Sequence, residues 1–491
     1  MANRNNSITL GKPYPPMREH SYREDRENLR ELLQQYQNLK QGKSHSFIEE
    51  DAFEQIITYY DDKDDLTEAL TAAEMGLELF PYSSSLMIRK ADILLATRKY
   101  KLALETLENA ALYDASDIDL YILKTDAYLA LDMQDKAVTL LQDALQLFDG
   151  EDRLDLLFEL ADVYDDYEQF DKVFDCLKII LEEDPNNDEA LYKICFWTDF
   201  TGRYEESIKL HQKIIDEFPY NEIAWFNLGA AFQGLKLYEK ALDAYEYVVV
   251  IDEKFDYAYR NMGDAYLRLR KYKDAIEVLE KVIELSRPED VIYEAIGHSY
   301  HRLGNYAQAR FNYKKAVHLN PDESKLHFKI ANTYMLEQQW SSAVKHLENA
   351  LRIQKNIPEF NLAMGECKMQ LGDTKEAINY FSNVVRSKPR NAVGWEALIR
   401  CLIGAKYFEE AITQCKAAIN TTDGKAIFIF YYSAILFATG KTKEALLQLE
   451  NAMAINAKLL KKFVALNPAI LQNNQVVDII ARRKKRKKGK H

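Results

Sequence analysis

A small residue recurs at a fixed spacing through most of this 491-residue chain. Seven alanines stand 34 residues apart without a slip, at Ala241, Ala275, Ala309, Ala343, Ala377, Ala411 and Ala445. The same spacing puts Ser207 and Val173 in this position and, after a two-residue insertion near 149–152, Ala137, Ala103 and Ala69. Such a period indicates similar structural units stacked in series, each too small to bury its apolar face alone.

Each repeat carries the pattern of two short amphipathic helices. Apolar residues recur at i, i+3, i+4 and i+7 in two stretches, separated by a short turn and closed by proline or acidic residues. Small residues are needed where two helix backbones cross closely, and aromatic side chains fill the wider gaps between helices. The sequence therefore predicts an all-α fold. Three residues before the small residue stand the aromatic residues Tyr100, Phe170, Tyr204, Tyr238, Tyr272, Tyr306, Trp340 and Phe408.

This pattern resembles the tetratricopeptide repeat (TPR), whose signature places Leu-Gly, Tyr, Ala, an aromatic residue, Ala and Pro at set positions. The resemblance implies a right-handed α-solenoid, the TPR superhelix, of antiparallel helix pairs with N- and C-terminal capping helices. The 34-residue period argues against the 35-residue pentatricopeptide repeat. The sixth repeat matches through Trp225, Leu228, Gly229, Phe232, Ala241 and Tyr245, and the eighth through Ile296, Gly297, Tyr300, Ala309, Tyr313, Ala316 and Pro321.

The repeat register divides the chain into five segments. The array of about twelve repeats is expected at 50–459, preceded by a capping helix and linker. A second capping helix should begin with Asn467 as N-cap and Pro468 in its first turn. The expected segments are a disordered N-terminus at 1–20, the capping helix and linker at 21–49, the repeats at 50–459, the C-terminal capping helix at 460–481 and a basic tail at 482–491.

Cysteine usage and missing motifs narrow the class of protein. The five cysteines are scattered and never form CxxC, which is typical of reduced thiols and predicts a cytoplasmic protein. No apolar run approaches the roughly 18 residues of a membrane span, and we expect no secretory signal. HExxH, GxSxG and GxGxxG do not occur, and "ATGKT" at 438–442 has Ile435 where a phosphate-binding loop needs glycine. We therefore predict a non-enzymatic protein with no cofactor and no metal, in which Gly440 forms a turn.

The resemblance also implies that the first helix of each repeat lines a concave groove, and the register assigns three zones to this groove. Repeats one to four contribute an acidic zone, for which an ordinary solvated surface is the alternative. Repeats four to six contribute aromatic residues, and repeats seven to nine a basic zone. The acidic zone comprises Asp51, Glu54, Asp61, Asp62, Asp92, Asp119, Asp126, Asp155, Glu159, Asp162, Asp165 and Asp166; the aromatic zone Phe158, Tyr192, Phe196, Phe200 and Phe226; and the basic zone Arg260, Asn261, Arg268, His298, His301, Arg302, Lys325, Lys329 and Asn332.

The basic zone partly resembles the carboxylate clamp of TPR co-chaperones. Arg260, Lys325 and Lys329 fall in basic clamp positions, but Asp264 and Ala295 stand where the clamp has asparagine. This departure argues against a chaperone tail and favours another acidic peptide or C-terminal carboxylate.

The stretch "GHSYHRLGNYAQA" at 297–309 places His298 and His301 one helical turn apart. A metal site would need further ligands, and His327 in the next repeat is the one candidate, so we predict a peptide-binding role instead. Binding through these histidines should strengthen as pH falls from about 7.5 to about 5.5, through the usual histidine range.

The chain carries its charge unevenly. The net charge is −13, and without the basic residues of 482–491 it would be −21. We predict a scaffold or adaptor that binds extended peptide segments or partner proteins in its groove. The alternative is a protein that contacts RNA, DNA, the ribosome or an anionic surface through its tail, while the repeats recruit protein partners. The basic residues of the tail are Arg482, Arg483, Lys484, Lys485, Arg486, Lys487, Lys488 and Lys490.

Overall fold

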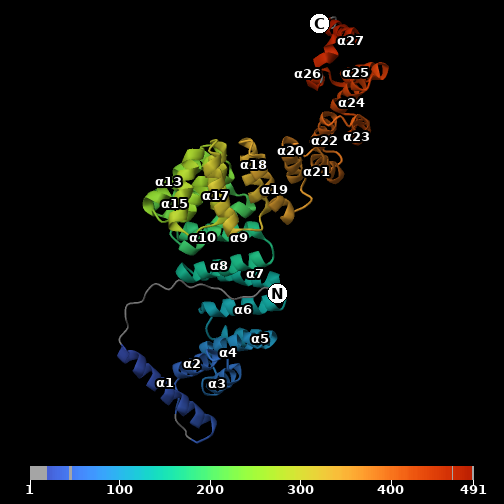
Figure 1. Cartoon of the computed structure of the whole chain (residues 1–491). Helices are drawn as coiled ribbons and strands as arrows, with labels where there is room; N and C mark the ends of the chain where they lie inside the picture. The colour runs from blue at the N-terminus through green and yellow to red at the C-terminus, as the bar shows by residue number, and fades with distance from the viewer. Residues whose placement is uncertain (1–18, 44–46, 467, 489–491) are drawn as a thin grey trace. The chain divides into compact units, whose positions relative to one another are not determined.

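The computed structural model describes residues 19–43, 47–466 and 468–488 (Figure 1). Its regular structure within these ranges is entirely helical, and most of it forms helix pairs of one repeat each. The predicted all-α repeat solenoid is confirmed. The pairs are α2 (Glu50–Asp61) with α3 (Leu66–Leu79), α4 (Ser84–Ala96) with α5 (Tyr100–Ala110), α6 (Ile118–Ala130) with α7 (Gln134–Ala144), α8 (Gly150–Asp166) with α9 (Phe170–Glu183), α10 (Asp188–Thr201) with α11 (Tyr204–Glu217), α14 (Asp256–Arg268) with α15 (Tyr272–Leu285), α16 (Asp290–Arg302) with α17 (Tyr306–Leu319), α18 (Ser324–Leu336) with α19 (Trp340–Ile353), α20 (Pro358–Gln370) with α21 (Thr374–Ser387), α22 (Ala392–Gly404) with α23 (Phe408–Thr421), and α24 (Ala426–Ala438) with α25 (Thr442–Asn456). Between α11 and α14 in the sequence, the chain also forms α12 (Glu222–Gly234) and α13 (Tyr238–Ile251).

The small residues of the 34-residue period lie where the two helices of a repeat cross. Ala241, Ala275 and Ala309 are fully buried. Across the same crossing, a Cβ atom added to Gly297 would stand 2.7 Å from the ring of Tyr313. Neither position leaves room for a larger side chain without displacing a neighbour, which is why the period is so strict.

The turn inside each repeat is built on one residue with positive φ. Gly304 and Gly440 hold φ values of 78° and 79° in this turn, and Arg270 and Lys406 adopt the same conformation with side chains. Glycine reaches this region without strain, whereas other residues seldom do. Gly440 therefore shapes a turn, as the sequence predicts.

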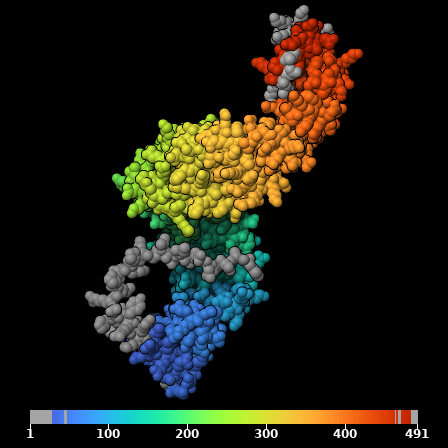
Figure 2. Space-filling model, viewed as in Figure 1, coloured from blue at the N-terminus to red at the C-terminus, as the bar shows by residue number. Residues whose placement is uncertain are grey.

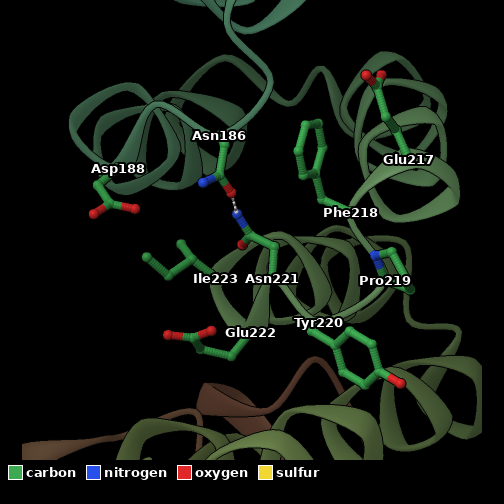
Figure 3. Close-up of a pocket in the computed structure, with 9 residues that line it drawn as sticks. All are labelled: Asn186, Asp188, Glu217, Phe218, Pro219, Tyr220, Asn221, Glu222 and Ile223. Atoms are coloured by element: carbon green, nitrogen blue, oxygen red, sulfur yellow. Dashed lines mark hydrogen bonds between the residues drawn. The ribbon is translucent and has the colours of Figure 1, made fainter.

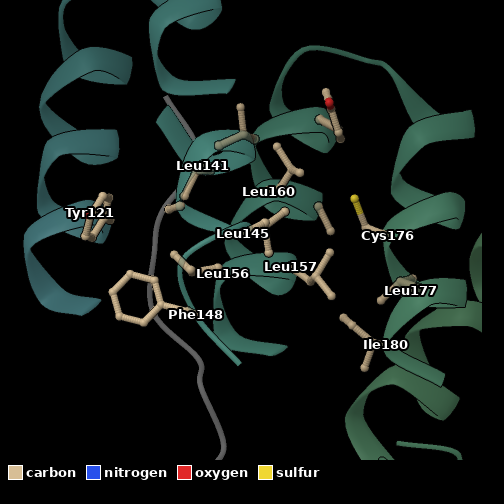
Figure 4. Close-up of a cluster of buried hydrophobic side chains, with 14 of the residues drawn as sticks. Tyr121, Leu141, Leu145, Phe148, Leu156, Leu157, Leu160, Cys176, Leu177 and Ile180 are labelled. Atoms are coloured by element: carbon tan, nitrogen blue, oxygen red, sulfur yellow. The ribbon is translucent and has the colours of Figure 1, made fainter. Parts of the chain in front are cut away.

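The chain forms two compact units, the N-terminal unit at 1–237 and the C-terminal unit at 238–491. Within each unit, helices pack chiefly against their neighbours in sequence, so the colours of Figure 2 follow one another in bands. The N-terminal unit holds one large apolar cluster through α4–α12, part of which Figure 4 shows around Phe148, Leu157 and Cys176. The ring of Phe148 meets that of Tyr121 edge to face at 5.3 Å.

Both ends of the array differ in detail from the sequence-based expectation. The first helix, α1 (Glu19–Lys40), begins two residues before the expected boundary. In place of one capping helix at 460–481, the chain forms α26 (Leu460–Leu466), a short 3-10 turn η2 (Pro468–Gln472) and α27 (Asn474–Lys488). A 3-10 turn, η1 (Ala457–Leu459), precedes them. The expected disorder at 1–18 lies outside the described residues.

The backbone of 482–488 continues α27, so most of the basic tail is not a separate segment. The side chains of these residues, and residues 489–491, lie outside the described part of the structure.

Candidate functional site

First helices of neighbouring repeats lie against one another. In the N-terminal unit α2 contacts α4, α4 contacts α6, and α10 contacts α12, whereas the second helices of neighbouring repeats have no contact of this extent among the described residues. Where first helices are in contact, they pack more closely than second helices do, as expected for the inner side of a solenoid. The residues of the three predicted zones belong to the first helices or their ends.

Carboxylates from three successive repeats meet around Asp92 on α4. Burial raises the pKa of Asp92, and the nearby carboxylates of Asp61, Asp119 and Asp126 raise it further, against a lowering by Arg89. Like charges within a short distance disfavour the ionised form of each. The structure therefore brings this part of the acidic zone together. Of the other members, Asp51 and Asp62 are exposed, and Glu54 accepts a hydrogen bond from the Ser85 hydroxyl.

The remaining acidic residues follow one face of α8. The pKa values of Asp155, Asp162 and Asp165 are all raised, first by burial and then by neighbouring carboxylates. Yet the Asp162 side chain keeps 70% of its surface exposed to water. Glu159 is half-buried on the same face, and Asp166 ends α8.

An exposed row of aromatic side chains runs along α10. Tyr192, Phe196 and Phe200 stand at i, i+4 and i+8, so they share one face of the helix, and they are 63%, 60% and 56% exposed. Trp197 supports the row from beside it, with its ring centre 5.0 Å from that of Phe196 and 5.7 Å from that of Phe200. Phe170 packs against Phe200 at 4.7 Å. We call Tyr192, Phe196 and Phe200 the aromatic row. Phe158 on α8 and Phe226 on α12 are half-buried.

The basic zone is largely neutralised by partners within the C-terminal unit. Both terminal nitrogens of Arg260 donate to Glu289, each at 2.9 Å, and its Nε donates to Asp256 at 3.3 Å. These pairings, chiefly the one with Glu289, raise the pKa of Arg260. In this structure the guanidinium that the sequence places in a clamp position is thus paired with two carboxylates of its own unit.

Most of the other basic-zone residues also have partners inside the protein. Lys329 pairs with Glu294, and the Arg302 Nε donates to the Tyr272 hydroxyl at 3.1 Å. Lys325 is exposed, and its backbone N–H donates to Glu323 at 3.0 Å. The remaining members are Arg268, which pairs with Asp264 at 3.3 Å, Asn261, whose amide donates to the Tyr245 hydroxyl at 3.2 Å, and Asn332, which is half-buried on α18.

His298 and His301 lie one turn apart on α16, each beside a tyrosine ring, Tyr272 and Tyr306 respectively. Burial lowers the pKa of both histidines, and the cationic side chains of Lys329 and Arg302 lower that of His298 further. Protonation of both histidines is thus shifted to lower pH, and the pH dependence of binding through them stays a prediction. Within the described ranges, no group of three or more His, Cys, Asp or Glu side chains is placed to hold a metal ion.

The sequence analysis missed one central residue. Lys193 on α10 lies between the acidic wall of α8 and the aromatic row, with its ammonium 2.8 Å from Glu189 and 3.9 Å from Asp162. The same ammonium lies over the ring of Phe158, 4.9 Å from its centre. The register could have identified Lys193, because it occupies the same place in its repeat as Lys329 does four repeats later.

A shallow pocket of about 400 Å³ opens at the turns that precede α10 and α12 (Figure 3). Asn221 donates to Asn186 at 2.7 Å across it, and Asp188, Glu217 and Glu222 line it. Each asparagine-rich turn also begins a helix: Asn221 accepts from the backbone of Ala224 at 2.8 Å. The pocket is therefore a by-product of helix capping. Of the helices in the described ranges, none is long and apolar enough to cross a membrane.

Paired helices in sequence order, joined by equivalent turns, define an α-solenoid repeat protein. Models of the tetratricopeptide repeat match 256–288 and 362–427, and a further TPR model matches 297–338. These matches show that the chain contains tetratricopeptide repeats. Tetratricopeptide repeats form protein-interaction scaffolds, and this fold is typical of proteins without catalytic activity.

No curated protein sequence matches the chain. Among solved structures it is similar to YrrB, a TPR protein with an unusual peptide-binding site, at 18% identity over 38% of this chain and 96% of that chain, with a TM-score of 0.35. It is also similar to the anaphase-promoting-complex hetero-tetramer Cut9–Hcn1, at 13% identity over 79% and 97%, with a TM-score of 0.34. A third is the C-terminal part of a TPR protein from Cytophaga hutchinsonii, at 16% identity over 52% and 98%, with a TM-score of 0.43.

Proposed function

We propose that this protein is a non-catalytic adaptor that binds extended peptide segments of partner proteins on the first-helix surface of its repeats. The observation that carries the proposal is the aromatic row of α10, whose three rings are each more than half exposed. Rigid aromatic side chains that remain in water on a packed scaffold are typical anchors for a binding partner.

The three zones contribute unequally to this proposed function. The aromatic row would supply most of the apolar contact, and the acidic carboxylates of α4 and α8 would set the preferred charge of the ligand. The basic zone would contribute less than the sequence suggested, because Arg260 and Lys329 are paired with Glu289 and Glu294. Lys325 is one of its exposed cations.

A peptide-display selection against the full chain tests the proposal. Selected sequences would be synthesised and their affinities measured by fluorescence anisotropy. The double variant Phe196→Ser/Phe200→Ser should weaken binding at least about tenfold, as expected for the loss of two anchors worth about 1 kcal/mol or more each. Because both rings are more than half exposed, the variant should keep its helical circular dichroism.

The matched control is Tyr82→Ser/Tyr113→Ser. These two rings are 71% and 51% exposed and lie 5.3 Å apart, but they follow second helices and stand outside the first-helix surface. Their loss should leave the affinity unchanged. Equal weakening by the two double variants would reject the proposed site, and a failure to select any peptide would reject the proposed function.

A second candidate function rests on the charge of the C-terminal segment. Eight of the ten residues at 482–491 are Lys or Arg, in a chain that is otherwise strongly acidic. We propose as the alternative that this segment binds nucleic acid through phosphate contacts, while the repeats recruit protein partners. Deleting 482–491 should then abolish binding to a single-stranded RNA, and binding by the intact chain should fall steeply as salt rises. Salt-sensitive RNA binding that survives the deletion would contradict this alternative.

A further inference from the structure

The first-helix surface of α8 and α10 already holds a cation, and the chain supplies that cation itself. The Lys193 ammonium is 2.8 Å from Glu189, 3.9 Å from Asp162 and 4.9 Å from the centre of the Phe158 ring. Two carboxylates and an aromatic face are the groups that recognise an ammonium or guanidinium in proteins. We call Phe158, Asp162 and Glu189 the cation box.

Lys193 neutralises only part of the negative charge near the cation box. In addition to the two carboxylates of the box, α8 carries Asp155, Glu159, Asp165 and Asp166, and Lys193 is the single cation at the positions of α8 and α10 that the repeat register assigns to the groove. The Asp162 and Glu189 side chains remain 70% and 61% exposed. Burial first, and then the carboxylates of Asp165, Glu189 and Asp166, raise the pKa of Asp162 even though Lys193 lowers it. The surface therefore keeps a negative potential that a further positive charge would relieve.

The aromatic row begins next to the box on the same helix. Tyr192 precedes Lys193 directly in the sequence, and Phe196 lies one turn farther along α10. A ligand cation in the box would thus bring the neighbouring part of the ligand onto Phe196 and Phe200. An extended chain spans about 3.3 Å per residue, so one short segment can reach both.

Resting on the proposed function, we propose that α8 and α10 select a cationic ligand: an extended segment of a partner protein in which Lys or Arg alternates with apolar residues. A lysine or arginine of this segment displaces the Lys193 ammonium from the cation box, and the apolar side chains lie on the aromatic row. The acidic residues of α8 pair with the remaining positive charges.

Three fluorescent twelve-residue probes test this assignment on the full chain. All carry leucine at every second position, and they carry lysine, glutamine or glutamate at the positions between. The lysine probe should bind about tenfold more tightly than the glutamine probe, since a cation–π contact and an exposed ion pair together contribute about 1–2 kcal/mol. The glutamate probe should bind more weakly still. Equal affinity for the three probes would overturn the cationic assignment.

Charge-neutralising variants test whether the preference for the lysine probe arises at the cation box. Asp162→Asn/Glu189→Gln should remove most of the preference for lysine over glutamine. The control Asp216→Asn/Glu217→Gln makes the same change of net charge at two exposed residues on the second helix α11, and should keep the preference. If both double variants lose the preference equally, the attraction comes from the net charge of the protein and the cation box is not the site.

The proposed displacement of Lys193 is tested by the affinity of a Lys193 variant for the lysine probe. Lys193→Met leaves the box empty and should raise the affinity for the lysine probe several-fold, whereas Lys178→Met removes a cation that pairs with Glu182 and Glu206 on second helices and should change it less. An unchanged or lower affinity in Lys193→Met would overturn the displacement.

This experiment separates the inference from the function on which it rests. Peptides that bind through the aromatic row without regard to charge would reject the cationic assignment and leave peptide binding intact. Failure of display-selected peptides to bind at all would reject both.

Discussion

At the residue scale, the glycines of the first helices decide how closely two helices can approach. A Cβ atom on Gly297 would lie 2.7 Å from the Tyr313 ring and 3.2 Å from the Ala309 carbonyl oxygen, and Tyr313 is fully buried. We expect Gly297→Ala to destabilise α16 and α17 by about 1–2 kcal/mol, because overpacking costs about 1–3 kcal/mol and alanine regains up to about 1 kcal/mol of helix propensity. Hydrogen exchange of these helices measures the change.

Gly404 provides the control, because a Cβ atom there meets nothing within 4 Å. Gly404→Ala should leave α22 unchanged or slightly more stable, and equal destabilisation at both glycines would exclude steric crowding as the cause.

The contrast between Gly297 and Arg260 shows which residues a sequence can assign. Gly297 recurs with the period, because every repeat must solve the same packing problem, so its role follows from the sequence alone. Arg260 meets Glu289 through a contact that belongs to one pair of neighbouring repeats. The pair of Arg260 and Glu289 does not recur in the other repeats. The sequence therefore indicated the positive charge of Arg260 but not its partner.

At the element scale, the end of the array depends on the helices that follow it. The helix α24 is apolar on nearly every face, which requires cover from more than its own repeat. Phe463 of α26 supplies part of that cover: it is fully buried, with its ring 5.6 Å from that of Phe430. We expect Phe463→Ala to destabilise α24 by about 3–5 kcal/mol, seen as faster hydrogen exchange in α24 and α25.

Leu471 in η2 serves as the control, because it is 44% exposed. Leu471→Ala should leave the exchange of α24 unchanged, and similar effects of the two substitutions would argue against a capping role for Phe463.

The helix boundaries of this C-terminal segment could be predicted only in part from the sequence. The sequence identified an apolar closing segment, and Ile470 and Val476 are indeed buried. It did not predict that the segment breaks into α26, η2 and α27, because no periodic neighbour exists there to define a register. Pro468, assigned to the first turn of an α-helix, instead begins the 3-10 turn η2.

At the scale of the whole molecule, the titratable groups divide the chain into regions that respond to pH in opposite directions. In α18 and α19, the rings of His327 and His346 lie 6.0 Å apart, and each has a buried Nδ1 without a hydrogen-bond partner. Burial, helped by the charge of His327 and Lys314, lowers the pKa of His346 to about 4. Burial and Arg352 lower that of His327.

A lowered histidine pKa means that folding favours the neutral ring. The resulting stability is fully present above the unfolded pKa of about 6.5 and is lost as pH falls toward the folded value. In α4 and α8 stability changes with pH in the opposite direction, because burial and neighbouring carboxylates raise the pKa values of Asp92 and Asp162. Their ionisation opposes folding at neutral pH, so this part of the chain gains stability as pH falls toward the raised values.

Lowering pH from 7.5 to 5 should therefore weaken α18 and α19 while it leaves α4 and α8 unchanged or better protected. Hydrogen exchange, corrected for the intrinsic effect of pH on the amide rate, measures both regions in one experiment. His346→Phe keeps an aromatic ring in place of the imidazole and should remove most of the acid sensitivity of α18 and α19, without altering α4 and α8. A uniform loss of protection along the chain would contradict this division, because it would mean that net charge, rather than these buried groups, sets the response to acid.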